Sequence, residues 1–152
     1  MSDMLSEHFS LDEFCLSQTA IRQGIDNTPP PEVIANLRLL AEQLEIVRTA
    51  TGGLPLIISS GYRSPELNHA VGGAANSAHV KGLACDFTIP RYGNVLKTAR
   101  AVAETGAQYD QIIYEFGRWI HLAVAAPGQA PRMQQLSIME AGKYYPGLSD
   151  TQ

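Results

Sequence analysis

The sequence predicts an α+β fold in which helices pack on a small antiparallel sheet. The first third of the chain carries a helical pattern, because apolar residues recur at alternating steps of four and three between positions 33 and 47. The later part carries strand patterns. Residues 109–115 and 119–124 are both β-prone, and the three residues between them include Gly117, which predicts a hairpin. Helices followed by hairpin-connected strands are typical of the α+β class.

Composition narrows the class of protein. The 152 residues are 45% hydrophobic and 17% charged, which is typical of a globular chain with its own core. The formal charge of −4 and only 11 scattered Lys and Arg argue against a nucleic-acid partner. No apolar stretch reaches the roughly 18 residues of a membrane span. We expect one domain over residues 1–152, with its core at about 8–125, and a monomer.

The N-terminal half begins with two predicted helices. Ser10 and Glu13 form a capping-box pattern that starts a short helix to about Leu16. Pro31 suits a first helical position, and the apolar stripe that follows predicts a helix to about Ala50.

The remaining elements follow in order. The connection over residues 60–82 lacks periodicity, and a connection this long within a compact domain is usually functional. Beyond Tyr145 we expect the tail to fray. The other predicted elements are strands at Leu54–Ser59, Leu83–Ile89 and 135–140, and a helix at 94–104.

His79 and Asp86 stand out within this frame. Asp86 interrupts an apolar strand, and a buried carboxylate without a partner is costly. An arginine, several hydrogen-bond donors or a cation would compensate it; a structural aspartate that accepts backbone N–H groups is the alternative. His8 and His69 have no such neighbours, and we interpret them as ordinary surface or core histidines.

His121 lies inside a second apolar strand, at 119–124. If the hairpin pairs residue 115 with residue 119, the odd-numbered side chains of both strands share one face, and Glu115 becomes a diagonal neighbour of His121. The same alternation places Asp110 on the opposite face. A bulge in the hairpin would reverse this choice.

Together these residues suggest a catalytic metal centre. Two imidazoles and one carboxylate are the ligands expected of a catalytic zinc, which keeps one position open. A zinc hydrolase also needs a carboxylate that is not a ligand and that accepts a proton from the attacking water, a role that Glu115 could fill. The chain contains no HExxH pattern, which excludes the common metalloprotease helix.

Three blocks of the sequence resemble one known family. They are SGYRSP at 60–65 with Asn68, SxHxxGxAxD at 77–86 and WxH at 119–121. These blocks are similar to those of the zinc D-Ala-D-Ala peptidases of the hedgehog/DD-peptidase fold, which include D-Ala-D-Ala carboxypeptidases, vancomycin-resistance dipeptidases and phage endolysins. The resemblance covers roughly residues 8 to 125.

The resemblance implies a role for each matching residue. It implies zinc ligation by His79, Asp86 and His121, and substrate contacts by Arg63 and Ser77. A planar guanidinium can bind a carboxylate through two parallel hydrogen bonds, although a structural ion pair is the alternative for Arg63. Ser77 could donate to a substrate oxygen or only shape its turn.

In one respect the chain departs from that family. Some members place the general-base glutamate three residues before the last histidine, where this chain has Arg118. The assignment of Glu115, six residues before His121, therefore rests on strand alternation.

The candidate metal centre and the resemblance together imply a zinc peptidase that cleaves D-amino-acid-containing peptide bonds of bacterial peptidoglycan, as a D-Ala-D-Ala carboxypeptidase or an endolysin endopeptidase. The alternative is a non-catalytic zinc-containing module of the same fold that binds cell wall or is a phage structural component. A thiol hydrolase that uses Cys85 is a remoter alternative. We expect Cys15 and Cys85 to be reduced and Cys85 to pack in the core.

Residues 1–10 lack the pattern of a secretory signal, so we expect synthesis in the cytoplasm. Action on the wall would then follow release during phage lysis, or delivery as a component of the virion.

Overall fold

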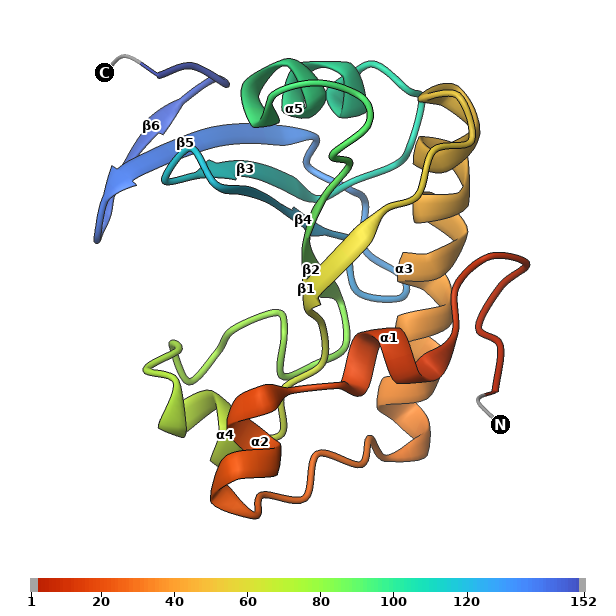
Figure 1. Cartoon of the computed structure of the whole chain (residues 1–152), viewed down its shortest axis with the longest axis vertical. Helices are drawn as coiled ribbons and strands as arrows, with labels where there is room; N and C mark the ends of the chain where they lie inside the picture. The colour runs from red at the N-terminus through yellow and green to blue at the C-terminus, as the bar shows by residue number, and fades with distance from the viewer. Residues whose placement is uncertain (1–2, 151–152) are drawn as a thin grey trace.

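The computed structural model describes residues 3–150, and the α+β prediction is confirmed (Figure 1). One sheet and the helices around it make up this part of the chain. The helices are α1 (Leu11–Cys15), α2 (Gln18–Gln23), α3 (Pro31–Ala50), α4 (Pro65–Ala70) and α5 (Val95–Ala103). The strands are β1 (Ile57–Ser60), β2 (Ala84–Thr88), β3 (Gln111–Glu115), β4 (Trp119–Ala123), β5 (Gln134–Glu140) and β6 (Lys143–Pro146).

The two helices predicted in the N-terminal half form for the expected reasons. Ser10 caps α1 through a capping box, in which its side chain accepts from the Glu13 backbone and the Glu13 carboxylate accepts from the Ser10 backbone. Pro31 begins α3 as its first residue. The apolar stripe of α3 is buried against the core, at Val33, Leu37, Leu40, Leu44 and Val47.

The sheet has the strand order β1-β2-β4-β3-β5-β6. Neighbouring strands are antiparallel except β3 and β5, which run parallel. The predicted antiparallel sheet is therefore confirmed, with this one parallel pair. The long connection between β4 and β5 carries the chain back along the sheet before β5 begins beside β3.

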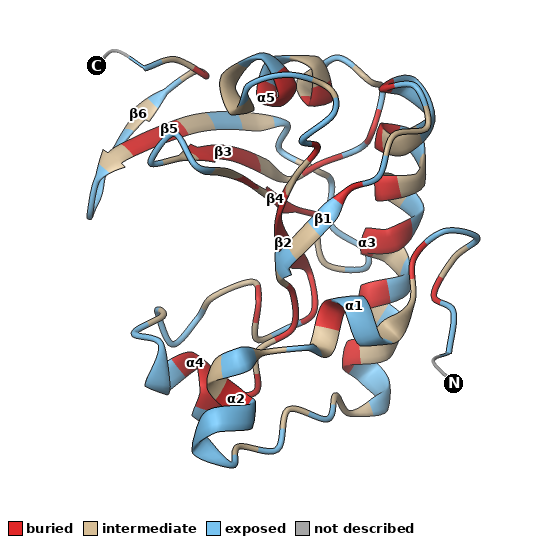
Figure 2. Ribbon diagram, in the orientation of Figure 1, coloured by how far each residue is buried: buried red, intermediate tan, exposed pale blue. Residues whose placement is uncertain are grey.

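The two faces of the sheet have different surroundings. Ile112, Tyr114, Ile120 and Leu122 point to one face and join a single buried cluster with α3 and α5. The buried residues accordingly line the side of α3 that faces the sheet (Figure 2). The odd-numbered residues of β3 and β4 point to the other face, which the connection between α4 and β2 borders.

Two short helices were not predicted from periodicity. Both α2 and α4 have six residues, too few for an apolar repeat, and each is capped by a serine: Ser17 accepts from the Ala20 backbone and Ser64 from the Leu67 backbone. The connection over 60–82 is therefore partly helical.

The expectation that the chain frays beyond Tyr145 is also wrong. β6 continues to Pro146, Leu148 is buried, and the Leu148 carbonyl accepts a hydrogen bond from Nε of Arg100 at 3.0 Å. Tyr114 donates to Asp150 at 2.6 Å, so the described end of the chain is fixed to the sheet. Over residues 3–150, the helices include none that is long and apolar enough to cross a membrane.

Candidate active site

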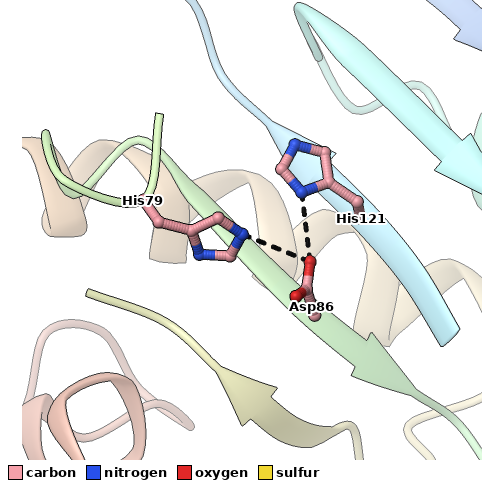
Figure 3. A group of neighbouring side chains, drawn as sticks. All are labelled: His79, Asp86 and His121. Atoms are coloured by element: carbon pink, nitrogen blue, oxygen red, sulfur yellow. Dashed lines mark hydrogen bonds and ion pairs between the residues drawn. The ribbon is translucent and has the colours of Figure 1, made fainter. Parts of the chain in front are cut away.

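The structure brings His79, Asp86 and His121 together (Figure 3). Nε2 of His79 lies 3.3 Å from Oδ1 of Asp86, and Nδ1 of His121 lies 3.0 Å from the same oxygen. One ligand atom from each residue falls within 4.8 Å of the other two, and the imidazole centroids are 5.1 Å apart. His79 and Asp86 are buried, and His121 is half-buried.

Two of the three side chains are placed by strand register. Asp86 on β2 pairs directly with His121 on β4, so their side chains leave the same face of the sheet side by side. This pairing was not predicted, because the sequence gives no sign of which strand lies beside β2. His79 comes from the connection before β2 and approaches the same point from outside the sheet (Figure 3).

The tautomer of His79 follows from its neighbour on the other side. Nδ1 of His79 lies 2.8 Å from the Gly61 carbonyl oxygen, which can only accept a hydrogen bond. Nδ1 therefore carries the proton, and Nε2 presents its lone pair toward Asp86 and His121. A backbone carbonyl that fixes a histidine in this way is a common support for a metal ligand.

Gly61 can hold that carbonyl because its backbone lies against α1. A Cβ on Gly61 would approach the backbone oxygen of Phe14 at 2.4 Å and its Cα at 2.7 Å, and the Tyr62 N–H donates to the same oxygen at 2.6 Å. Only glycine permits this approach.

We expect Gly61→Ala to lower the free energy of unfolding by about 1–3 kcal/mol, because the added methyl group meets backbone rather than a flexible side chain. The displaced carbonyl should also weaken metal binding through His79. Urea unfolding and zinc titration measure the two effects. Gly106→Ala is a control for the zinc titration only: its Cβ would meet nothing within 4 Å, but its φ of +91° is strained for any residue with a side chain. If Gly61→Ala has the same free energy of unfolding as the unmodified protein, the close approach of Gly61 to Phe14 is contradicted.

The ionisation of Asp86 is set by competing effects. Burial alone would raise the pKa of its carboxyl, but its contacts with the His121 and His79 imidazoles outweigh burial and hold this pKa well below the ordinary value. Asp86 is thus an anion that faces two nitrogen atoms through one oxygen.

The donor set fits zinc. Zinc bonds to nitrogen and carboxylate oxygen are about 2.0 to 2.2 Å long, so tetrahedral ligand atoms lie roughly 3.3 to 3.5 Å apart. The separations of 3.3 and 3.0 Å from Oδ1 of Asp86 are close to this spacing. Among residues 3–150, the groups of His, Cys, Asp and Glu that could hold an ion comprise this one set of three, so no fourth such ligand closes the site.

The cluster lines a cleft of about 630 Å³ on the open face of the sheet. Glu115 and Trp119 line the same cleft. The predicted register holds without a bulge: Glu115 pairs with Trp119, and Ile113 pairs with His121. The alternation argument is therefore confirmed for Glu115, which lies diagonally from His121 on the shared face.

The Glu115 carboxylate is partly shielded from water. Burial raises its pKa above the ordinary value, although the nearby His121 opposes this rise. Nε1 of Trp119 donates to Oε1 of Glu115 at 2.6 Å. A carboxylate with a raised pKa beside a candidate metal site is suited to taking up a proton and releasing it again.

Arg63 lines the cleft next to the cluster. Its Nη2 is 4.0 Å from Oδ2 of Asp86, and its Nη1 donates to Oδ1 of Asn68 at 3.2 Å. The Arg63 side chain is partly exposed and lines the cleft, so its guanidinium can bind a further group besides Asp86 and Asn68.

Sequence reasoning missed how Asn68 supports Arg63. The buried Asn68 amide also donates to the Ala74 carbonyl at 2.8 Å and so joins Arg63 to the connection that carries His79. Gly73 packs on this pair, since a Cβ there would lie 2.1 Å from Oδ1 of Asn68 and 2.9 Å from Nη1 of Arg63. Asn68 belongs to the first sequence block, but its type alone gave no indication of this double contact.

Ser77 also lines the cleft. Its Oγ accepts a hydrogen bond from the His79 N–H at 3.2 Å, which shapes the turn before the ligand. Because the hydroxyl accepts in this contact, its proton stays available for another acceptor. Both roles considered for Ser77 are compatible with this geometry.

The prediction that Asp110 lies on the opposite face is wrong. Asp110 precedes the first residue of β3, so strand alternation does not govern its side chain, and it lines the rim of the same cleft. Arg132 binds it with Nε at 3.0 Å and Nη2 at 2.8 Å. Because Arg132 binds Asp110, Glu115 is the candidate among these two carboxylates for a base beside His121. Of the other histidines, His8 pairs with Glu45 at 2.7 Å on the surface, and His69 is exposed on α4.

The two cysteines are free thiols, and Cys85 lies in the core as predicted. Burial raises the pKa of the Cys85 thiol well above its ordinary value, and burial and the charge of Asp12 raise the pKa of Cys15 to about 11. Both therefore stay protonated at neutral pH.

We expect iodoacetamide at neutral pH to modify neither thiol at an appreciable rate in the folded protein, because the thiolate is the reactive form. Mass spectrometry before and after unfolding measures the modification, with the unfolded chain as the reactive control. Rapid alkylation of native Cys85 together with loss of activity would favour a thiol hydrolase.

Comparisons with known proteins agree with this geometry. The zinc D-Ala-D-Ala carboxypeptidase of Streptomyces albus G is 40% identical over 53 residues, which are 35% of this chain and 21% of that protein. The match thus spans about a fifth of the length of that relative. A family model described as Peptidase M15 matches residues 7–123, which contain His79, Asp86, His121 and Glu115. On this match over most of its length, the chain belongs to the peptidase M15 family.

Proposed function

We propose that this protein is a zinc-dependent peptidase that hydrolyses peptide bonds formed by D-amino acids in bacterial peptidoglycan. One observation carries the proposal: the ligand atoms of His79, Asp86 and His121 meet within 4.8 Å in a cleft that Glu115 also lines. Membership of the peptidase M15 family supports peptidase activity. The similarity to a zinc D-Ala-D-Ala carboxypeptidase supports zinc and this substrate class.

The chemistry divides between the metal and the chain. Zinc held by the three ligands would supply Lewis acidity toward the substrate carbonyl and the attacking water. Glu115 accepts a proton from that water while the oxygen of the water bonds to the carbonyl carbon. When the carbon–nitrogen bond breaks, Glu115 returns the proton to the leaving amine.

Arg63 and Ser77 position the substrate in this proposal. The guanidinium of Arg63 binds a substrate carboxylate, as a peptide that ends in D-Ala would present, and Asn68 holds the guanidinium in place. The Ser77 hydroxyl donates its proton to a substrate oxygen while still accepting from the His79 backbone.

The alternative is a non-catalytic module in which zinc is structural. Structural zinc sites are closed by four protein ligands, whereas the described residues group three. The arrangement with three ligands and a carboxylate nearby favours catalysis.

Digestion of purified peptidoglycan tests the proposal. The zinc-loaded protein should produce new peptide termini, a chelator should abolish them, and added zinc should restore them. Mass spectrometry separates the two forms of the activity, since a carboxypeptidase releases free D-Ala and an endopeptidase creates a new amino terminus within the stem or cross-link. A zinc-loaded protein that releases neither product would favour the binding module.

We also propose where the activity is used. A peptidoglycan peptide as substrate places the action at the cell wall, reached from the cytoplasm by release during phage lysis or as a virion component. Light scattering during size-exclusion chromatography tests the expected monomer.

A further inference from the structure

We infer that Trp119 is a positioning residue for Glu115 and that Phe116 holds Trp119 in place. This role rests on the proposed function, because it concerns how the candidate general base is oriented. Three observations carry it: a hydrogen bond, a ring contact and a strained backbone at the tip of the β3–β4 hairpin.

The hydrogen bond fixes one oxygen of Glu115. Trp119 stands directly opposite Glu115 in the strand register, and Nε1 of its indole donates to Oε1 at 2.6 Å. An indole nitrogen can only donate, so Oε1 is committed as an acceptor. The second oxygen, Oε2, is then left to exchange a proton in the cleft that both residues line.

The ring contact holds the indole. The Phe116 ring lies beside the Trp119 ring, with centroids 5.8 Å apart and planes at 57°. Because Trp119 is only half-buried, Phe116 supplies a wall on one side of a ring that solvent would otherwise reach.

The strained backbone at Phe116 indicates that the contact between Phe116 and Trp119 contributes to something other than stability. Phe116 has φ +57°, in the left-handed region that bulky residues rarely adopt, and Gly117 follows with φ +68°. Asparagine or glycine is preferred at such a position in a tight hairpin. Phe116 is moreover 37% exposed, so it adds little to the core. A strained residue that packs on a side chain of a candidate site is a common sign of function.

Substitutions at Trp119 and Phe116 separate positioning from a structural role. Trp119→Phe keeps the aromatic body but removes the donor, and we expect kcat on peptidoglycan peptides to fall roughly tenfold to a hundredfold with KM and zinc affinity little changed. Phe116→Asn should relieve the strain and raise Tm by about 2 to 4 °C, yet lower kcat severalfold. Stability and activity then move in opposite directions.

Met133→Asn is the matched control. Met133 is the other non-glycine residue with positive φ within residues 3–150, at +54°, and it is similarly exposed. The same relief of strain should raise Tm there without the fall in kcat.

Fluorescence gives a readout that does not depend on activity. Trp119 is the only tryptophan of the sequence, so the emission comes from this one ring and reports on its surroundings. Excitation moves electron density away from the pyrrole ring, and a negative charge beside Nε1 stabilises the excited state. Glu115→Gln should therefore move the emission to shorter wavelength, and Phe116→Asn should also change it.

The outcomes distinguish this inference from the proposed function. If the unmodified protein hydrolyses peptidoglycan while Trp119→Phe keeps its full kcat, the positioning role is wrong and the proposed function stands. Unchanged emission in Glu115→Gln would likewise contradict a carboxylate charge beside Nε1 of Trp119. If the zinc-loaded unmodified protein shows no hydrolysis, both the proposed function and the positioning role fail, whatever the emission shows.

Discussion

Asp86→Asn should abolish zinc binding and hydrolysis together. Asparagine keeps the shape of the side chain but removes the charge that faces His79 and His121 through one oxygen. In the unmodified protein, zinc at about a thousand times its Kd should add roughly 4 kcal/mol to the free energy of unfolding, or about 8 to 16 °C in Tm. The variant should show no such shift. Thermal unfolding with and without zinc, and the zinc content after dialysis, measure the loss.

Asp110→Asn is the control for that experiment. It makes the same chemical change on the rim of the same cleft, where the carboxylate is bound by Arg132 rather than by imidazoles. We expect its zinc-dependent shift in Tm to match that of the unmodified protein. Retention of zinc by a folded Asp86→Asn variant would show that the cluster is not the metal site.

Glu115→Gln should lower kcat by about 10² to 10⁴ while zinc stays bound. Glutamine has nearly the same size, and its carbonyl oxygen can still accept from Trp119, but it cannot take a proton from water. Its effect therefore isolates proton transfer. Release of new termini from peptidoglycan gives the rate, and zinc content shows that the ligands are intact.

Glu140→Gln provides the comparison on an exposed glutamate, which forms only a surface pair with Lys143 at 3.1 Å. Its hydrolysis rate should be unchanged. If Glu115→Gln cleaves peptidoglycan at the full rate with zinc bound, another group removes the proton, and the alternation argument led to the wrong base.

The parts of the fold that local pattern governs could be predicted. The buried stripe of α3 follows from apolar spacing alone, and the hairpin register that places Glu115 opposite Trp119 follows from its short loop. The placement of His121 on the open face of the sheet and of Cys85 in the core follows from the alternation of side chains along a strand.

The parts that depend on contacts distant in sequence could not be predicted. The pairing of Asp86 with His121 joins strands separated by α5 and β3, and the parallel pairing of β3 with β5 depends on a long connection. The contact of His79 with the Gly61 carbonyl likewise depends on how a long connection folds back. Asp110 shows the limit of alternation, because it lies one residue before the regular strand.

The division of each strand between two faces constrains how the length of this chain can change. Asp86 lies between Cys85 and Phe87, both of which are fully buried in the core. Inserting or deleting a single residue within β2 would rotate the following side chains by half a turn, driving an anion into hydrocarbon and a phenylalanine into solvent. Tolerated insertions should therefore be confined to connections such as 125–133, where side chains do not alternate between the two faces of a strand.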